Sequence, residues 1–575
     1  MRIKHFFGLA VIAAMTASCS SNNDLVNGGG GNSSSEVENG TAYASFKINL
    51  PTTSGTRAAG DPTFVDGDKT EYAVNDATLL VFKKEGSDYK FKEKVDLGNM
   101  EPWTSSTTDG ITTTAKLTAK ITKAEVGSDK GYYALIVLNN NSGTDEKITY
   151  PDVDETYAKW SQDDKKAKAT NYLKHDKGFF MANAPKYVAG APETLVEIKN
   201  IYASKQQAEN STATTVYVER GLAKVSLASG SENKHFDIKS GNYNGDKVDI
   251  TGWTLDVTNT KTFPVHVTDG LWKDTWKETT TPAATNGATM NRFRDTNPTA
   301  EFPRVYWGLD PNYSNDFTFT SVPACKDEFK MATTADFKKD EDAKKPQYCL
   351  ENTFDIDHMV QGQTTRVLFS AKYKPNDIPE GETFYKMGNS SQLWNADKVV
   401  AQITAKAQEV LGETDADKVK VTLNASGNDM TKAGVHLVEA VNVQHNSVNI
   451  SDDDALKINA KLGFKKATPT DAAVGLSTFE SGVSYYIARV KHFGDALTPW
   501  NPGDKTYDKN NANWLGRYGV LRNNWYELTV KSVSGPGYPD IPKVNPTDPD
   551  DVNDQYINVE VKILDWAKRS QDVDL

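Results

Sequence analysis

The sequence predicts an all-β fold in which two unequal domains form β-sandwiches, with a short helical insertion. Short apolar segments bounded by turn residues recur along the 575 residues, whereas clear helical periodicity occurs once. The composition, 38% hydrophobic and 10% aromatic, is that of a globular chain. The predicted strands after the first are 77–82, 132–138, 214–227, 248–257, 366–373, 418–423, 482–490, 525–533 and 556–566.

The N-terminus has the pattern of an export signal. Arg2 and Lys4 are followed by an apolar run over residues 6–14, which is too short to span a bilayer. Small residues at positions 16–18 precede Cys19. We therefore expect a signal peptide over residues 1–18, with cleavage just before Cys19. In the alternative interpretation, the chain has an ordinary signal peptide and Cys19 is unrelated to its cleavage.

The first predicted strand follows a Gly-, Ser- and Asn-rich tether over residues 20–40. Ala44, Phe46, Ile48 and Leu50 alternate with polar residues, which predicts a strand with one buried face. Pro51 ends the pattern, and a small, polar segment with Arg57 at its centre follows. Polar loops of this kind are preferred sites of proteolytic cleavage.

The one predicted helix begins after Asn395 and ends at Gly412, which are typical N-cap and C-cap residues. Its apolar positions recur at helical spacing from Val399 to Leu411, which indicates an insertion packed on a sheet. Turn-forming residues over 229–246 suggest a domain boundary. We therefore expect a propeptide over 19–57, an N-terminal domain over 58–230 and a C-terminal domain over 231–575.

The last predicted strand carries the same alternation as the first. Ile557, Val559, Val561 and Ile563 alternate with polar residues after a proline-broken, acidic segment. If the first strand were cut off after Arg57, its empty groove would need another strand. The C-terminal strand of a second copy is a suitable donor, because an extended segment can complete a sheet through backbone hydrogen bonds.

The sequence gives no positive evidence of an enzyme, a cofactor or a metal site. The eight histidines are not at metal-binding spacings, and nucleophile and phosphate-loop motifs are missing. Acidic clusters at 452–454 and at Asp548, Asp550, Asp551 and Asp554 are interpreted as solvated linkers rather than calcium sites. The formal net charge of −12 argues against nucleic acid or anionic membrane as the main partner.

Cys325 and Cys349 remain as an even pair once Cys19 is set aside. In an exported protein this pair is compatible with a disulfide, and two separate buried thiols are the alternative.

Several motifs, taken in order, resemble the fimbrillins of type V pili and, within them, the shaft subunit of the minor or short fimbria. The matching segments are the Cys19 region, 56–60, 219–225, 304–307, 310–313, 348–353, 485–487, 491–494, 516–526, Trp566 and 571–575. The resemblance implies two transthyretin-like β-sandwich domains. It also implies acylation of Cys19, transport of the precursor to the outer membrane, and cleavage by an Arg-specific protease between Arg57 and Ala58. Subunits would then polymerise through strand exchange into an extracellular fimbria.

The expected partners are other copies of the chain, accessory and anchor subunits, the protease, and host or bacterial receptors. The lipid would be the only membrane attachment. An accessory, tip or anchor subunit is an alternative of the same class. A surface lipoprotein that binds glycans through Trp272, Trp276, Trp500 or Trp514 is an alternative of another class.

Overall fold

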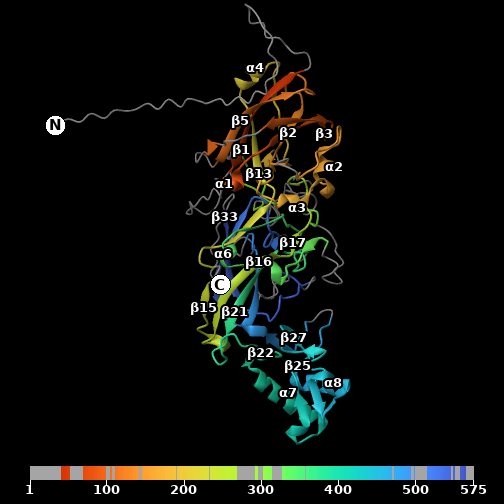
Figure 1. The fold of residues 1–575 in the computed structure, drawn as a ribbon. Coiled ribbons are helices and arrows are strands. Elements are labelled where there is room, and N and C mark those ends of the chain that lie inside the picture. The colour runs from red at the N-terminus through yellow and green to blue at the C-terminus, as the bar shows by residue number, and fades with distance from the viewer. Residues whose placement is uncertain are drawn as a thin grey trace, which may run out of the picture.

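The computed structural model describes three β-rich units, which Figure 1 shows arranged end to end. Strands dominate and helices are few and mostly short, so the predicted all-β fold class is confirmed. The described residues are 41–51, 69–98, 104–105, 111–140, 146–188, 191–231, 234–268, 292–295, 302–313, 327–355, 358–468, 472–493, 498, 514–544, 548–550 and 557–564.

The first unit is one sheet that folds back on itself. Its strand order is β3-β2-β7-β8-β13-β1-β5-β4, and β11 pairs with β7. The first residues of β13 pair with β1 and its last residues pair with β8, so β13 joins the two halves that enclose the core. The bounds are β1 (Ala42–Pro51), β2 (Ala77–Glu85), β3 (Asp88–Gly98), β4 (Thr104–Ser105), β5 (Ile111–Ile121), β7 (Tyr132–Leu138), β8 (Met181–Asn183), β11 (Val196–Glu197) and β13 (Thr214–Arg220).

A second apolar cluster lies on the outer face of β2 and β7. Leu80 and Leu135 alternate with the residues of the first core and pack in a cluster with the fully buried Trp160. Trp160 lies on α2 (Tyr157–Ser161), and Tyr172 of α3 (Ala169–Tyr172) joins the same cluster. The central strands of this unit are therefore buried on both faces.

The chain leaves the first sheet at Gly221 and Leu222, before the predicted boundary at 230/231. The segment predicted as one strand over 214–227 is two strands, β13 and β14 (Ala223–Leu227), which belong to different sheets. A side chain at Gly221 would lie 2.8 Å from the Phe180 ring and 2.9 Å from the Tyr172 ring, so the close passage requires glycine.

The second unit is a sandwich of two sheets around one core. One sheet has the order β20-β14-β32-β33, and the other has the order β15-β16-β21-β31 with β19 paired to β16. The bounds are β15 (His235–Asp237), β16 (Lys247–Asp256), β19 (Lys338–Lys339), β20 (Gln347–Cys349), β21 (Arg366–Lys374), β31 (Val483–Arg489), β32 (Trp525–Val533) and β33 (Ile557–Leu564).

The third unit is inserted between β21 and β31 and is larger than the predicted helical insertion. The predicted helix is confirmed as α7 (Ala396–Leu411): Asn395 accepts a hydrogen bond from the Lys398 N–H, and Gly412 has a φ of 64°. A second helix, α8 (Asp452–Leu462), packs with α7 in one core. The small sheets are β23-β22-β30-β27 and β24-β28-β29, over β22 (Phe384–Met387), β23 (Leu393–Trp394), β24 (Val419–Val421), β27 (Gly434–His436), β28 (Val443–His445), β29 (Val448–Asn449) and β30 (Leu476–Phe479).

The acidic cluster at 452–454 is not a solvated linker, as the sequence had suggested. It forms the first turn of α8, where Ser451 caps the helix by accepting from the Asp454 N–H. Carboxylates at this position are stabilised by the exposed N–H groups and the dipole of the helix.

Shorter elements lie within and between these units. They are α1 (Lys69–Tyr72), β6 (Gly127–Ser128), η1 (Asp164–Lys166), β9 (Lys186–Val188), β10 (Ala191–Glu193), β12 (Asn200–Ile201), α4 (Lys205–Glu209), η2 (Gly241–Tyr243), β17 (Thr258–Asn259), β18 (Phe329–Lys330), η5 (Thr334–Asp336), α6 (Asp340–Ala343), η7 (Ala416–Lys418), β25 (Asn424–Ala425), β26 (Asn428–Asp429), η8 (Ala440–Asn442) and η9 (Glu480–Gly482).

Candidate functional site: the first and last strands

The first strand, β1, lies inside the sheet of the first unit. It pairs along its whole length with β5 in antiparallel register, from Ala42 opposite Ile121 to Pro51 opposite Ile111. On its other side, Phe46 to Asn49 pair with Thr214 to Tyr217 of β13 in parallel register. Strand β1 therefore supplies backbone hydrogen bonds to two neighbours, and both would lose them if it left.

The four apolar residues that predicted this strand all point into the core. Ala44, Phe46 and Ile48 have no exposed surface and Leu50 is 1% exposed. They pack with residues of β2, β5, β7 and β13 in the main core of the first unit. Burial of a large apolar side chain contributes roughly 1.5–3 kcal/mol, so this strand contributes a substantial part of the stability of the unit.

The opposite face of β1 is also largely buried, whereas the sequence predicted a single buried face. Ser45 and Asn49 are both buried, and Asn49 Oδ1 accepts a 2.7 Å hydrogen bond from Thr114 Oγ1. Helix α4 packs against β1 and β5, and Lys116 Nζ of β5 donates to the carbonyl of Glu209 at 3.0 Å. Of the polar residues that alternate with the core residues, Ser45 and Asn49 are thus enclosed, whereas Lys47 is half-exposed.

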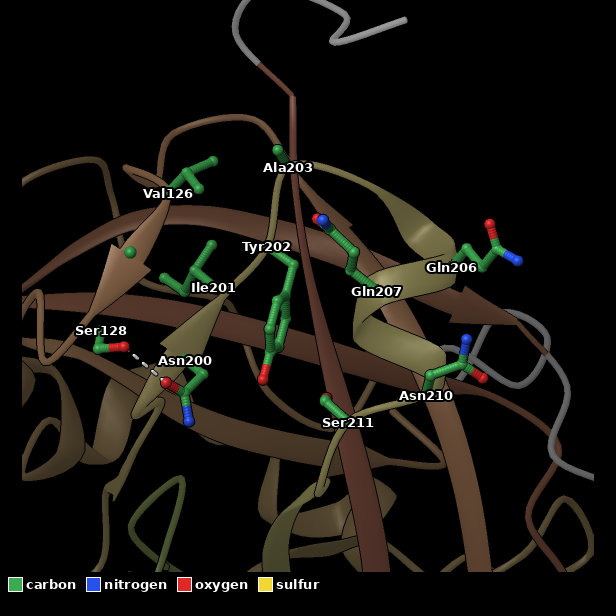
Figure 2. Close-up of a pocket in the computed structure, with 11 residues that line it drawn as sticks. Val126, Ser128, Asn200, Ile201, Tyr202, Ala203, Gln206, Gln207, Asn210 and Ser211 are labelled. Atoms are coloured by element: carbon green, nitrogen blue, oxygen red, sulfur yellow. Dashed lines mark hydrogen bonds between the residues drawn. The ribbon is translucent and has the colours of Figure 1, made fainter. Parts of the chain in front are cut away.

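A shallow, uncharged cleft lies at the beginning of β1 (Figure 2). The backbone N–H and C=O groups of Tyr43 and Tyr202 form two reciprocal hydrogen bonds of 2.8 Å beside it. Figure 2 shows Tyr202 between β12 and Gln207 of α4. The lining carries no charged side chain: it consists of Val126, Gly127, Ser128, Asn200, Ile201, Tyr202, Ala203, Gln206, Gln207, Asn210 and Ser211.

The last strand, β33, has a different position from β1. It pairs with β32 in antiparallel register and forms the edge of its sheet, from Ile557 opposite Val533 to Leu564 opposite Trp525. The side chains of Ile557, Val559 and Val561 are half-buried and pack against the core of the second unit. The backbone of Ile563 pairs with Tyr526, and its side chain lies outside the described set. An edge strand can leave a sheet with the loss of one neighbour rather than two.

The segment just before β33 is fixed to the second unit, so the interpretation of its acidic residues as solvated was wrong at Asp550. Asp550 is fully buried, and its carboxylate accepts a 2.6 Å hydrogen bond from Thr364 Oγ1. The backbone of Asp548 accepts from the Gln361 N–H at 2.9 Å. These contacts hold residues 548–550 on the second unit.

Several motif residues meet in buried ion pairs near the passage between the two sandwiches. Glu219 lies 2.7 Å from Arg304 and 2.5 Å from His266, and Glu351 lies 2.8 Å from Arg522. Burial opposes ionisation of Glu219, but the charges of His266 and Arg304 hold its pKa below the usual value. The sequence did not predict these pairs, because their members lie up to 171 positions apart.

Other predicted positions fall outside the described residues: Cys19, Arg57, Ala58, Cys325, Trp272, Trp276 and Trp500. Cys349 is a buried free thiol whose pKa is raised by burial to about 12. Trp514 is half-buried and packs against the aromatic cluster around Trp307.

Within the part of the chain that the structure describes, no group of acidic, His and Cys side chains is placed to hold a metal ion. No helix in the same residues has the length and apolar character required to cross a membrane.

A match to a known protein family covers the last strands of the chain. Residues 477–572 match the fimbrillin C-terminal family, described as major fimbrial subunit protein type IV. The fimbrillin match therefore spans β31, β32 and β33. No curated protein matches the sequence significantly.

Two solved structures share low sequence identity with this chain. A fimbrilin, FimA, from Porphyromonas gingivalis W83 is 11% identical, with 93% of this chain and all of that chain covered at a TM-score of 0.35. The tip fimbrial protein Mfa3 from Porphyromonas gingivalis, with a C-terminal truncation, is 12% identical, with 91% and 100% covered at a TM-score of 0.26.

Proposed function

We propose that this chain is the structural shaft subunit of a surface fimbria of the minor or short type. In the precursor, β1 fills the groove between β5 and β13. Cleavage after Arg57 releases this strand, and the C-terminal strand of a neighbouring copy takes its place by donor-strand exchange. The resulting filament would support adhesion and biofilm formation, without enzymatic activity or a cofactor.

The contrast between β1 and β33 is the observation that carries this proposal. Strand β1 is an interior strand whose Phe46 and Ile48 are fully buried, so its loss would expose the core to water. Strand β33 is an edge strand with the same alternation of apolar residues, and Val559 and Val561 are only half-buried. A strand that is essential to its unit therefore precedes Arg57, and a strand that is easier to detach lies at the other end of the chain.

The distribution of arginines supports cleavage at a single position. Arg57 is the only arginine between Arg2 and Arg220. Among the described residues no arginine is exposed: Arg292 and Arg294 are half-buried, and the buried ones are Arg220, Arg304, Arg366, Arg489, Arg517 and Arg522. In the part of the chain that the structure describes, a protease specific for arginine would thus find few accessible sites, while many lysines are exposed; Arg569 lies outside that part.

We also propose a cellular location and binding partners for this subunit. Acylation of Cys19 would hold the precursor at the outer membrane, and this lipid would be the only membrane attachment. After cleavage the subunit would join an extracellular fimbria with other copies and with accessory and anchor subunits. Receptors on host or bacterial surfaces would then be reached by the filament. Cys349 is a free thiol in the structure; that it pairs with Cys325 in the exported protein stays a separate proposal, to be checked by mass spectrometry with and without reduction.

Polymer formation by the purified precursor tests this function. We expect treatment with an arginine-specific protease to yield a ladder of high-mass species in unheated denaturing gels. Val559→Asp or Val561→Asp should abolish the ladder, because a charge would enter the core of the neighbouring subunit. Glu560→Gln, at the intervening position of the same strand, is the matched control and should keep it.

Cleavage must be followed in the same samples. An intact ladder in Val561→Asp would contradict the proposed donor strand. Wild-type protein that is cut after Arg57 but stays monomeric would contradict polymerisation, and saturable sugar binding by such a monomer would favour the glycan-binding alternative.

A further inference from the structure

Glu71 is a buried acid in the first element that the structure describes after Arg57. It lies on α1, is 1% exposed, and follows Ala58 by 13 positions. A buried carboxylate at this place is unusual, because charged groups are rarely enclosed unless they have specific partners.

The partners of Glu71 are strong hydrogen-bond donors. Its Oε1 atom accepts from Lys224 Nζ and from Tyr348 Oη, both at 2.7 Å. Its backbone carbonyl accepts from Arg220 Nε at 2.9 Å. The Lys224 ammonium also lies 3.8 Å from the centre of the Trp525 ring, on which it makes a cation–π contact.

These partners belong mainly to one sheet of the second unit. Lys224 lies on β14 and pairs across the strands with Tyr348 of β20 and with Trp525 of β32. Trp525 in turn pairs with Leu564 of β33. Glu71 therefore connects α1 of the first unit to the sheet that carries the proposed donor strand.

We propose that Glu71 is the positioning residue that anchors the beginning of the processed chain. This inference rests on the proposed function. In the precursor, α1 is joined to β1 through residues 52–68, Tyr72 packs against the core of the first unit, and Glu71 contacts the second unit. After cleavage the link to β1 is gone and the chain begins 11 positions before α1, where local fraying is expected. The Glu71 contacts then keep α1 on the donor-strand sheet.

Hydrogen exchange on precursor and cleaved protein tests this anchor. Glu71→Gln keeps the shape of the side chain but removes the charge that faces Lys224. We expect amide exchange over residues 69–74 to rise about tenfold or more in the cleaved variant relative to cleaved wild type. The rise in the uncut variant relative to uncut wild type should be clearly smaller. Glu85→Gln is the matched control, because Glu85 also pairs with lysines, Lys90 and Lys92, but at the exposed end of a hairpin. It should leave exchange over 69–74 unchanged.

If the role of Glu71 is merely structural, Glu71→Gln will raise exchange equally in cut and uncut protein. That result would overturn the anchor. Equal exchange in cleaved wild type and cleaved Glu71→Gln would overturn it too. If Glu71→Gln does not fold, Tyr348→Phe removes one hydrogen bond to Glu71 and keeps the charge pair; it should give a smaller rise, again larger after cleavage, and no rise would overturn the anchor.

N-terminal sequencing of each sample separates the two proposals. A chain that is not cut after Arg57 overturns the proposed function and removes the basis of the anchor. A correct cut with unchanged exchange overturns the anchor alone.

Discussion

Asp310 is a buried acid whose ionisation the fold opposes. Its carboxylate accepts 2.6 Å hydrogen bonds from the backbone N–H groups of Asn312 and Thr353. Burial nevertheless dominates and raises the pKa of Asp310 to about 7, and the nearby charge of Glu351 acts in the same direction.

This raised pKa predicts a specific pH dependence. An unfolded Asp titrates near pH 3.9, so between about pH 4 and pH 7 the folded protein binds the proton more tightly than the unfolded chain. The contribution of Asp310 to the free energy of unfolding therefore falls as pH rises through this window, by up to about 1.4 kcal/mol per pH unit. We expect Asp310→Asn to remove this part of the slope in urea unfolding measured at pH 4, 5, 6 and 7. An unchanged slope would contradict it.

At the scale of elements, substitutions in β1 should change the stability of the precursor and not that of the polymer. Phe46→Ala should lower the free energy of unfolding of the precursor by about 3–5 kcal/mol, because it leaves a cavity in the core. Lys47→Ala, the half-exposed neighbour on the same strand, should change it by less than about 0.5 kcal/mol. Once the polymer has formed, β1 has been removed, and both variants should unfold like wild type in denaturant titrations. A polymer weakened by Phe46→Ala would show that β1 is retained.

Local patterns in the sequence were sufficient to predict some elements well. The alternation from Ala44 to Leu50 predicted β1, the alternation from Ile557 to Ile563 predicted β33, and Asn395 with Gly412 predicted the ends of α7. In each case the signal lies within one element, where side-chain periodicity reflects a buried face directly.

The strand partners were not predicted, because pairing joins residues far apart in the chain. Leu117, Ala119 and Ile121 alternate with polar residues and could have indicated β5, but nothing local places β5 beside β1. The beginning of α8 was misinterpreted although Ser451 is a good cap, because three aspartates looked like a linker. Burial of Asp550 depends on Thr364, a partner 186 positions away.

At the scale of the whole molecule, the groove strand and the proposed donor strand lie in different units. Strand β1 belongs to the first unit and β33 to the second. If β33 of one copy fills the groove of the next, the contact is heterologous, and such contacts extend into an open filament when they do not close into a ring. The third unit lies at the end of the molecule farthest from the first (Figure 1), away from both strands.

N-terminal sequencing of the protein in high-mass assemblies from the cell surface tests the central claim most directly. Strand exchange predicts that the assembled chain begins at Ala58, without Cys19 and without β1. Assembled protein that still begins at a lipidated Cys19 would retain its first strand and would contradict strand exchange.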